Sequence, residues 1–161
     1  RLVREYLPAA VADGNNLEAR TQMLVASTMG ATAFQRGLGA MHALAHPLGA
    51  LYNAHHGTLN AVLMPYVLVE NRKVIEERIC RLARSIGIDD PGFSSFLDWV
   101  LQLRETLDIP QNLEALGIDD AQAERVGEMA EADPSSGTNP ILFSADQYQS
   151  LFLKALKGNL G

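Results

Sequence analysis

Cysteine is nearly absent from this sequence of 161 residues, in which Cys80 is the only one. A single cysteine excludes an internal disulfide and the paired cysteines of zinc fingers, and it fits a reducing compartment. No run of basic residues is long enough to follow a phosphate backbone, and the formal net charge is −6. These absences argue against disulfide scaffolds, zinc fingers and nucleic-acid-binding proteins.

Long hydrophobic runs and strand patterns are also missing. No window approaches the ~18 consecutive apolar residues of a membrane span. The first residues, Arg1 to Glu5, lack the apolar core of a secretory signal. Apolar and polar residues rarely alternate over four or more positions, which argues against strands. We therefore expect a soluble, cytoplasmic protein without membrane contact.

The sequence contains ample material for a helical core, because 47% of its residues are apolar and only 20% are charged. Apolar residues recur at helical spacing and predict one all-α domain of about seven helices. Residues 17–34 are apolar on most sides, so this helix is expected at the centre. Pro65 is expected to interrupt residues 58–69, and a separate surface helix is expected from Asn71 to Ile86. Asp119 or Asp120 is expected to cap a helix reaching Ala132, residues 133–140 form a loop, and Ser144 begins the last helix.

All four histidines lie within fifteen residues, at His42, His46, His55 and His56. His42 and His46 are four apart, so a helix places both imidazoles on one face, within reach of a shared ion. A turn after this helix can bring His56 back toward His42. Taken alone, the pair favours two helix histidines bonded to backbone or water.

The order of residues around these histidines resembles the signature of the iron-containing (group III) alcohol dehydrogenases. The resemblance spans about thirty-five residues, and a smaller match, Gly137-Thr138-Asn139-Pro140, resembles the family's late Gly-x-Asn-Pro loop. The residues that carry it are Gly37-Leu38-Gly39-Ala40-Met41-His42-Ala43-Leu44-Ala45-His46-Pro47-Leu48-Gly49, Tyr52-Asn53, His56-Gly57, Asn60-Ala61, Met64-Pro65 and Asn71.

The resemblance implies that residues 1–161 form the family's C-terminal helical domain, of the dehydroquinate synthase-like type. An N-terminal domain, expected to be absent here, would bind NAD or NADP. The resemblance also implies that His42 and His56 are metal ligands, for Fe²⁺ first and Zn²⁺ as an alternative. His46 would lie beside substrate and nicotinamide as the catalytic and cofactor-contacting histidine. The expected partners are an alcohol or aldehyde, the N-terminal domain and further copies of the chain.

The remaining ligands would be an Asp and a His in an Asp-x-x-x-His spacing, which does not precede His42. We therefore expect the chain by itself to be inactive. A divalent ion lowers the pKa of an alcohol's hydroxyl, and neutral imidazoles bind such an ion without cancelling its charge. His46 could then relay the proton or orient the substrate.

Other reactive residue types have simpler interpretations. His55 stands where the family commonly has proline. Three roles are open for it: it competes for the metal, it tunes the site, or it faces solvent. Cys80 is interpreted as a structural thiol and Trp99 as a core residue. Ser135 and Ser136 are interpreted as loop residues near the substrate, without a base to activate them.

Two alternatives to an alcohol dehydrogenase stay open at this point. The first is maleylacetate reductase, which resembles these enzymes but has a different pattern around the histidines. The second is a helical interaction module whose histidines are structural. His56-Gly57 and the Ala43-Leu44-Ala45 spacer favour the alcohol dehydrogenase over maleylacetate reductase.

Overall fold

The computed structural model describes residues 1–160, and these residues fold into α-helices with three short 3₁₀ turns and no strand. Gly161, the last residue of the predicted domain, lies outside the described part. The prediction of an all-α fold with about seven helices is confirmed. The helices are α1 (Leu2–Ala12), α2 (Leu17–Ala33), α3 (Gly39–Tyr52), α4 (His56–Ser85), α5 (Phe93–Thr106), α6 (Ala123–Ala132) and α7 (Ala145–Lys157), and the 3₁₀ turns are η1 (Phe34–Arg36), η2 (Glu114–Leu116) and η3 (Ser136–Thr138).

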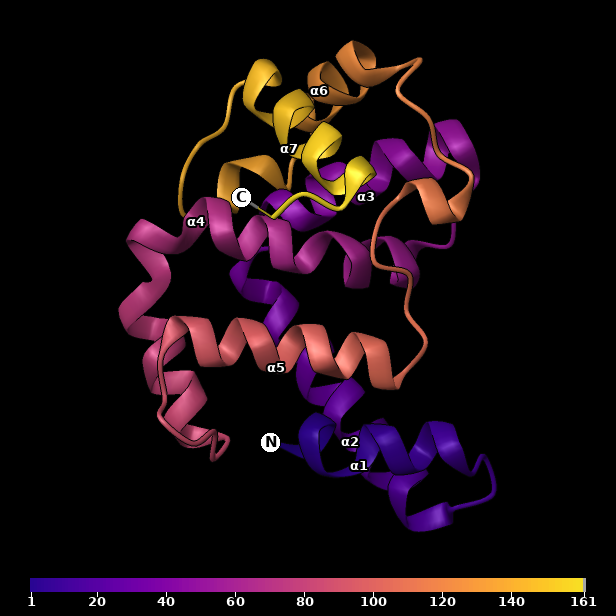
Figure 1. The fold of residues 1–161 in the computed structure, drawn as a ribbon, viewed down its shortest axis with the longest axis vertical. Coiled ribbons are helices and arrows are strands. Elements are labelled where there is room, and N and C mark those ends of the chain that lie inside the picture. Colours follow the sequence, from indigo (N-terminus) through magenta and orange to yellow (C-terminus); the bar gives the residue numbers. More distant parts are fainter. Residues whose placement is uncertain (161) are drawn as a thin grey trace.

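The helices are arranged along the long axis of the molecule (Figure 1). Helices α3, α6 and α7 gather at one end, α4 and α5 cross the middle, and α1 lies at the other end with the start of α2. The larger apolar cluster joins α3, the first half of α4, α6 and α7. A smaller cluster joins the second half of α4 to α5. Helix α3 is therefore held by packing on several sides, and the site described below lies on this helix.

Helix α4 corrects one prediction, because it runs unbroken through Pro65 for 30 residues. A proline inside a helix removes one backbone hydrogen bond. Pro65 is itself buried next to Leu63 and Tyr66, which belong to the larger core cluster. Packing of these neighbours offsets the lost bond, so the predicted break before Asn71 does not occur.

Helix α2 corrects a second prediction, because it is not central. Ala19 is its only buried residue, whereas Leu24 is 70% exposed and Met29 is 62% exposed. Apolar residues all round a helix predict burial only where other elements surround it, and the main helix contact of α2 in residues 1–160 is with α1. Leu7 and Val11 of α1 border a hollow of about 580 Å³ beside α4 and α5.

The ends of α6 and α7 test two cap predictions. Helix α6 begins after Gln122, which makes no side-chain cap, so the prediction of an Asp119 or Asp120 cap is wrong. Asp119 instead accepts hydrogen bonds from the Tyr52 hydroxyl and from the backbone of Ala121. Helix α7 begins as predicted at Ser144, whose side chain forms a reciprocal capping box with Gln147.

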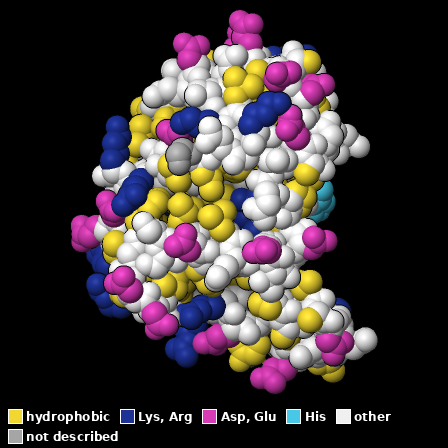
Figure 2. Space-filling model, in the orientation of Figure 1, with side chains coloured by type: hydrophobic (Ala, Val, Ile, Leu, Met, Phe, Trp, Pro, Cys, Tyr) yellow, Lys and Arg dark blue, Asp and Glu magenta, His cyan; other side chains and the backbone are white. Residues whose placement is uncertain are grey.

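The distribution of charged side chains on the surface agrees with the lack of basic runs in the sequence. On the face shown in Figure 2, acidic and basic side chains are interspersed among apolar ones without a continuous basic patch. Among the helices of residues 1–160, none has both the length and the apolar character needed to cross a bilayer. Trp99, predicted in the core, is partly buried and packs on Phe96 with ring centres 5.5 Å apart.

Candidate metal and substrate site

Helix α3 carries two histidines on the face that its buried side does not use. Ala43, Leu44 and Leu48 are fully buried in the larger cluster, and they fix the rotation of the helix. His42 and His46 are less buried, and their ring centres are 6.0 Å apart. The predicted placement of both imidazoles on one face is confirmed.

His56 joins this pair from the first turn of α4. Asn53 ends α3 in the left-handed conformation, with φ 52°, which lets the chain reverse within three residues. The ring centre of His56 lies 5.2 Å from that of His42 and 5.4 Å from that of His46. The His46 and His56 rings are nearly parallel, with 14° between their planes. Three imidazoles predicted from the sequence therefore meet at one place.

His42 is the most enclosed of the three. Its Nδ1 is buried and has no hydrogen bond of normal geometry. Burial lowers the pKa of His42, and positive charge on His56 or His46 lowers it further. The backbone of Leu38 and the carboxylate of Asp133 oppose this lowering without reversing it. The ring is therefore held in the neutral form, which has a lone pair available for a cation.

His46 has a carboxylate partner. Its Nδ1 lies 2.8 Å from Oδ2 of Asp133, at the end of α6. Burial alone would raise the pKa of Asp133, but hydrogen bonds from His46 and from the Ser135 backbone outweigh it, and the pKa is lowered. The carboxylate is thus ionised at neutral pH and accepts hydrogen bonds from both neighbours.

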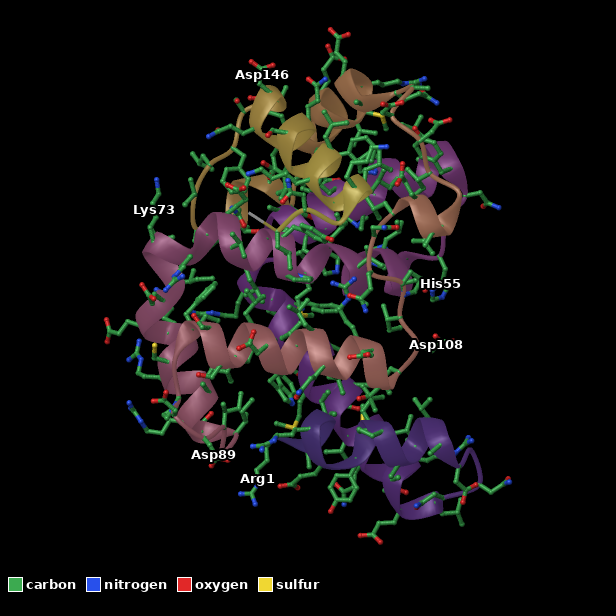
Figure 3. All side chains as sticks on the ribbon, viewed as in Figure 1. Arg1, His55, Lys73, Asp89, Asp108 and Asp146 are labelled. Atoms are coloured by element: carbon green, nitrogen blue, oxygen red, sulfur yellow. The ribbon has the colours of Figure 1, made fainter. Side chains whose placement is uncertain are left out.

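The two histidines at the start of α4 have different partners. Nε2 of His56 lies 2.9 Å from the side-chain nitrogen of Asn60, one turn further along the helix. His55 is the N-cap residue of α4, and its Nδ1 accepts a hydrogen bond from the backbone N–H of Thr58 at 3.3 Å. Figure 3 shows His55 at the edge of the molecule, near the start of α4. The exposed side chain of His55 fits the solvent-facing role considered above, and its role as a helix cap was not predicted.

The loop after α6 holds the start of α3 in place. The hydroxyl oxygen of Thr138 accepts hydrogen bonds from the backbone N–H groups of Leu38 and Gly39, at 3.1 and 3.0 Å. Oδ1 of Asn139 accepts one from Ala40 at 3.1 Å. These contacts satisfy N–H groups that have no partner within the helix itself. The two segments that carry the family resemblance are therefore in direct contact.

The Gly-x-Gly pattern before His42 has a structural cause. Gly37 and Gly39 have φ values of 103° and 71°, which other residues rarely adopt. A Cβ on Gly37 would lie 2.4 Å from Cβ of Thr138, and one on Gly39 would lie 3.2 Å from Oδ1 of Asn139. Both glycines let the loop approach closely enough to cap α3.

The histidines suit part of a metal site. Two imidazoles that share one ion, at a metal–nitrogen distance of about 2.1 Å, have ring centres about 5 Å apart. The separation of His42 and His56 fits this value. In residues 1–160 no group of three or more His, Cys, Asp or Glu side chains is arranged to hold a metal ion. Within these residues, His42 and His56 offer two imidazoles at a separation that fits one shared ion.

Comparison with known proteins identifies the family. Residues 1–156 match the family model described as "Fe-containing alcohol dehydrogenase family, C-terminal". The chain belongs to the iron-containing alcohol dehydrogenase family. It is 35% identical to alcohol dehydrogenase 4 of Saccharomyces cerevisiae over 157 residues, which cover 96% of this chain and 41% of that protein. It is also 35% identical to the 1,3-propanediol dehydrogenase of Citrobacter freundii, with 96% and 42% coverage.

Solved structures of the iron-containing alcohol dehydrogenase family share the fold. A crystal structure of 1,3-propanediol oxidoreductase superposes with a TM-score of 0.92 at 33% identity, covering 96% of this chain and 42% of that one. The chain thus spans about two fifths of the length of the curated relatives it matches. Both of these relatives are dehydrogenases by name.

Sequence reasoning missed Asp133 as a partner of His46. The two residues are 87 positions apart, so no local spacing pairs them. The signal that could have found Asp133 is its place four residues before Gly137, in the loop that resembles the family's late motif. Ser135 and Ser136 are buried, and Ser136 accepts a hydrogen bond from Tyr148. Cys80 is a free, partly buried thiol on α4.

Proposed function

We propose that residues 1–161 are the C-terminal, metal-binding domain of an NAD(P)-dependent alcohol dehydrogenase. The observation that carries this proposal is the meeting of His42, His46 and His56 on α3 and α4, in a chain of this family. Because the matched relatives are more than twice as long, we propose that a further domain of the same protein binds the dinucleotide. That domain would also supply the missing metal ligands.

In this proposal His42 and His56 hold a divalent ion, iron first and zinc as the alternative. When bound, such an ion would lower the pKa of an alcohol's hydroxyl and so favour oxidation of the alcohol by a nicotinamide cofactor. Burial lowers the pKa of His42, which supports its part because only a neutral imidazole can bind a cation. The core packing of α3 keeps His42 in place without help from the ion.

His46 is proposed to contact substrate and nicotinamide rather than the ion. Its Nδ1 is engaged by Asp133, and its side chain is 42% exposed. Nε2 is then the atom free to exchange a proton with the reacting hydroxyl. The stacked His56 ring lies on one side of His46 and restricts its movement.

The test is an assay of the full-length protein that contains this chain, loaded with Fe²⁺ or Zn²⁺. We expect reduction of NAD or NADP that depends on a primary alcohol, and the reverse reaction with an aldehyde. Reduction of maleylacetate instead of aldehydes would favour the alternative activity. A fully metal-loaded protein that transfers hydride with none of these substrates would contradict the proposal.

A further inference from the structure

The carboxylate of Asp133 is held between two donors. Oδ2 lies 2.8 Å from Nδ1 of His46, and Oδ1 accepts a hydrogen bond from the backbone N–H of Ser135, also at 2.8 Å. The side chain is only 14% exposed, whereas that of His46 is 42% exposed. The less exposed carboxylate, which accepts two hydrogen bonds, therefore fixes the more exposed imidazole.

The backbone around Asp133 is tied to the helix that carries His46. Asp133 ends α6, whose Val126 and Ala130 are fully buried in the core. A few residues later, Thr138 and Asn139 cap the start of α3. The same loop thus anchors α3 at its first turn and contacts it again at His46. The position of the carboxylate relative to the imidazole is therefore set by the core packing of helix α6 before Asp133 and by the cap of α3 after it.

From this geometry we propose that Asp133 is a positioning residue for His46, an inference that rests on the proposed function. An ionised carboxylate can only accept hydrogen bonds, so Nδ1 of His46 must carry the hydrogen. In the neutral ring the lone pair is then on Nε2, at the other end of the imidazole. Asp133 therefore selects the tautomer of His46 and directs Nε2 away from α6.

A purely structural role for the contact gives a different expectation. Ion pairs that involve a partly exposed group contribute little to stability. If Asp133 only fastened α6 to α3, its loss would change folding and would affect activity regardless of what stands at position 46. If it acts through His46, its loss matters only while His46 is present.

The first measurement needs no variant at Asp133. Histidine-selective ¹⁵N labelling of the full-length, zinc-loaded protein gives the tautomer of each ring, and the signal missing from H46A identifies His46. We expect the hydrogen on Nδ1 in the unsubstituted protein and its loss from Nδ1 in D133N. A neutral His46 with its hydrogen on Nε2 in the unsubstituted protein would overturn the inference.

The second measurement is a double-mutant cycle in alcohol oxidation. Asn at position 133 keeps an oxygen for the Ser135 N–H but can present an N–H group to His46. We expect D133N to lower kcat on the order of 10- to 100-fold, by analogy with the loss seen when the hydrogen-bond partner of a metal-ligating histidine is removed. KM, metal content and melting temperature should stay close to those of the control D98N, which changes an exposed residue of α5.

The cycle also separates this inference from the proposed function. H46A is expected to lower kcat by about 10²- to 10⁴-fold, and D133N should lower it no further in the H46A background. A D133N effect that multiplies with that of H46A, or a D133N kcat equal to that of D98N, would overturn the inference alone. An H46A protein with unchanged kcat would instead contradict the role of His46 in the proposed function.

Discussion

The side-chain amides of Asn71 and Asn139 are hydrogen bonded to each other in both directions. Each amide nitrogen donates to the other's oxygen, at 3.2 and 3.0 Å, and both side chains are buried. Asn139 also accepts from the backbone of Ala40 and donates to that of Ile141. One buried polar group therefore joins α4, the start of α3 and the loop that contains Asp133.

Replacing Asn139 by alanine should destabilise the chain strongly. The change removes the acceptor of the Ala40 N–H and the donor to Oδ1 of Asn71, although the Asn71 amide nitrogen still donates to the Val67 carbonyl. Each buried group left unsatisfied costs about 1–3 kcal/mol. We expect N139A to lower the free energy of unfolding in urea by at least about 2 kcal/mol. Q102A, at an exposed position of α5, should change it by less than about 0.5 kcal/mol. Equal stability of the two variants would show that the amide pair contributes nothing.

Gly37 is predicted to be irreplaceable for a steric reason. Its φ of 103° disfavours any side chain, and a Cβ would overlap Cβ of Thr138 at 2.4 Å. We expect G37A to lower the melting temperature and to loosen the cap of α3, at a cost of about 1–3 kcal/mol. The matched control is G14A, because Gly14 has nothing within 4 Å and no positive φ. Hydrogen exchange at Leu38, Gly39 and Ala40 measures the cap directly, and unchanged protection in G37A would refute this account.

Tyr148 gives a pH-dependent prediction. It is completely buried, and burial raises the pKa of its hydroxyl although the hydrogen bond to Ser136 partly opposes this. The folded chain thus holds the phenolic proton more tightly than the unfolded chain does. The stability linked to Tyr148 is fully present below about pH 10 and is lost as the pH rises through the folded-state pKa.

Y148F should therefore lose less stability between pH 9 and 11 than the unsubstituted chain, even if its stability at pH 7 is lower. Burial also raises the pKa of Tyr66, so some pH dependence should remain. Urea unfolding at a series of pH values gives the slope of unfolding free energy against pH for Y148F and for the unsubstituted chain. Parallel slopes would show that Tyr148 does not titrate differently in the folded chain.

The features that the sequence predicted well are local ones. His42 and His46 share a face because they are four residues apart, and His56 returns to them because the connection after α3 is short. The start of α7 was predictable because Ser144 and Gln147 form a cap within four residues. In each case the physical cause acts within a few turns of the chain.

The features that it missed depend on residues far apart in the chain. The exposure of α2 depends on which elements pack against it, and composition does not specify them. The continuity of α4 depends on packing around Pro65, which offsets a local preference for a break. The contact between His46 and Asp133 depends on how α6 docks against α3. The family resemblance identified the segment around His46 and the loop at Gly137, but it did not predict the hydrogen bond between His46 and Asp133.

In the proposed site, His42 and His56 bind the metal ion while their neighbour His55 does not. The most direct measurement is the metal content of the full-length protein and of its H42A, H56A and H55A variants, by elemental analysis after purification in the presence of Fe²⁺. We expect H42A and H56A to lose the metal while they remain helical by circular dichroism. H55A should keep the metal, because His55 caps α4. Loss of this cap should lower the stability of the protein by about 1 kcal/mol. One equivalent of metal in both H42A and H56A would contradict the assignment of the site.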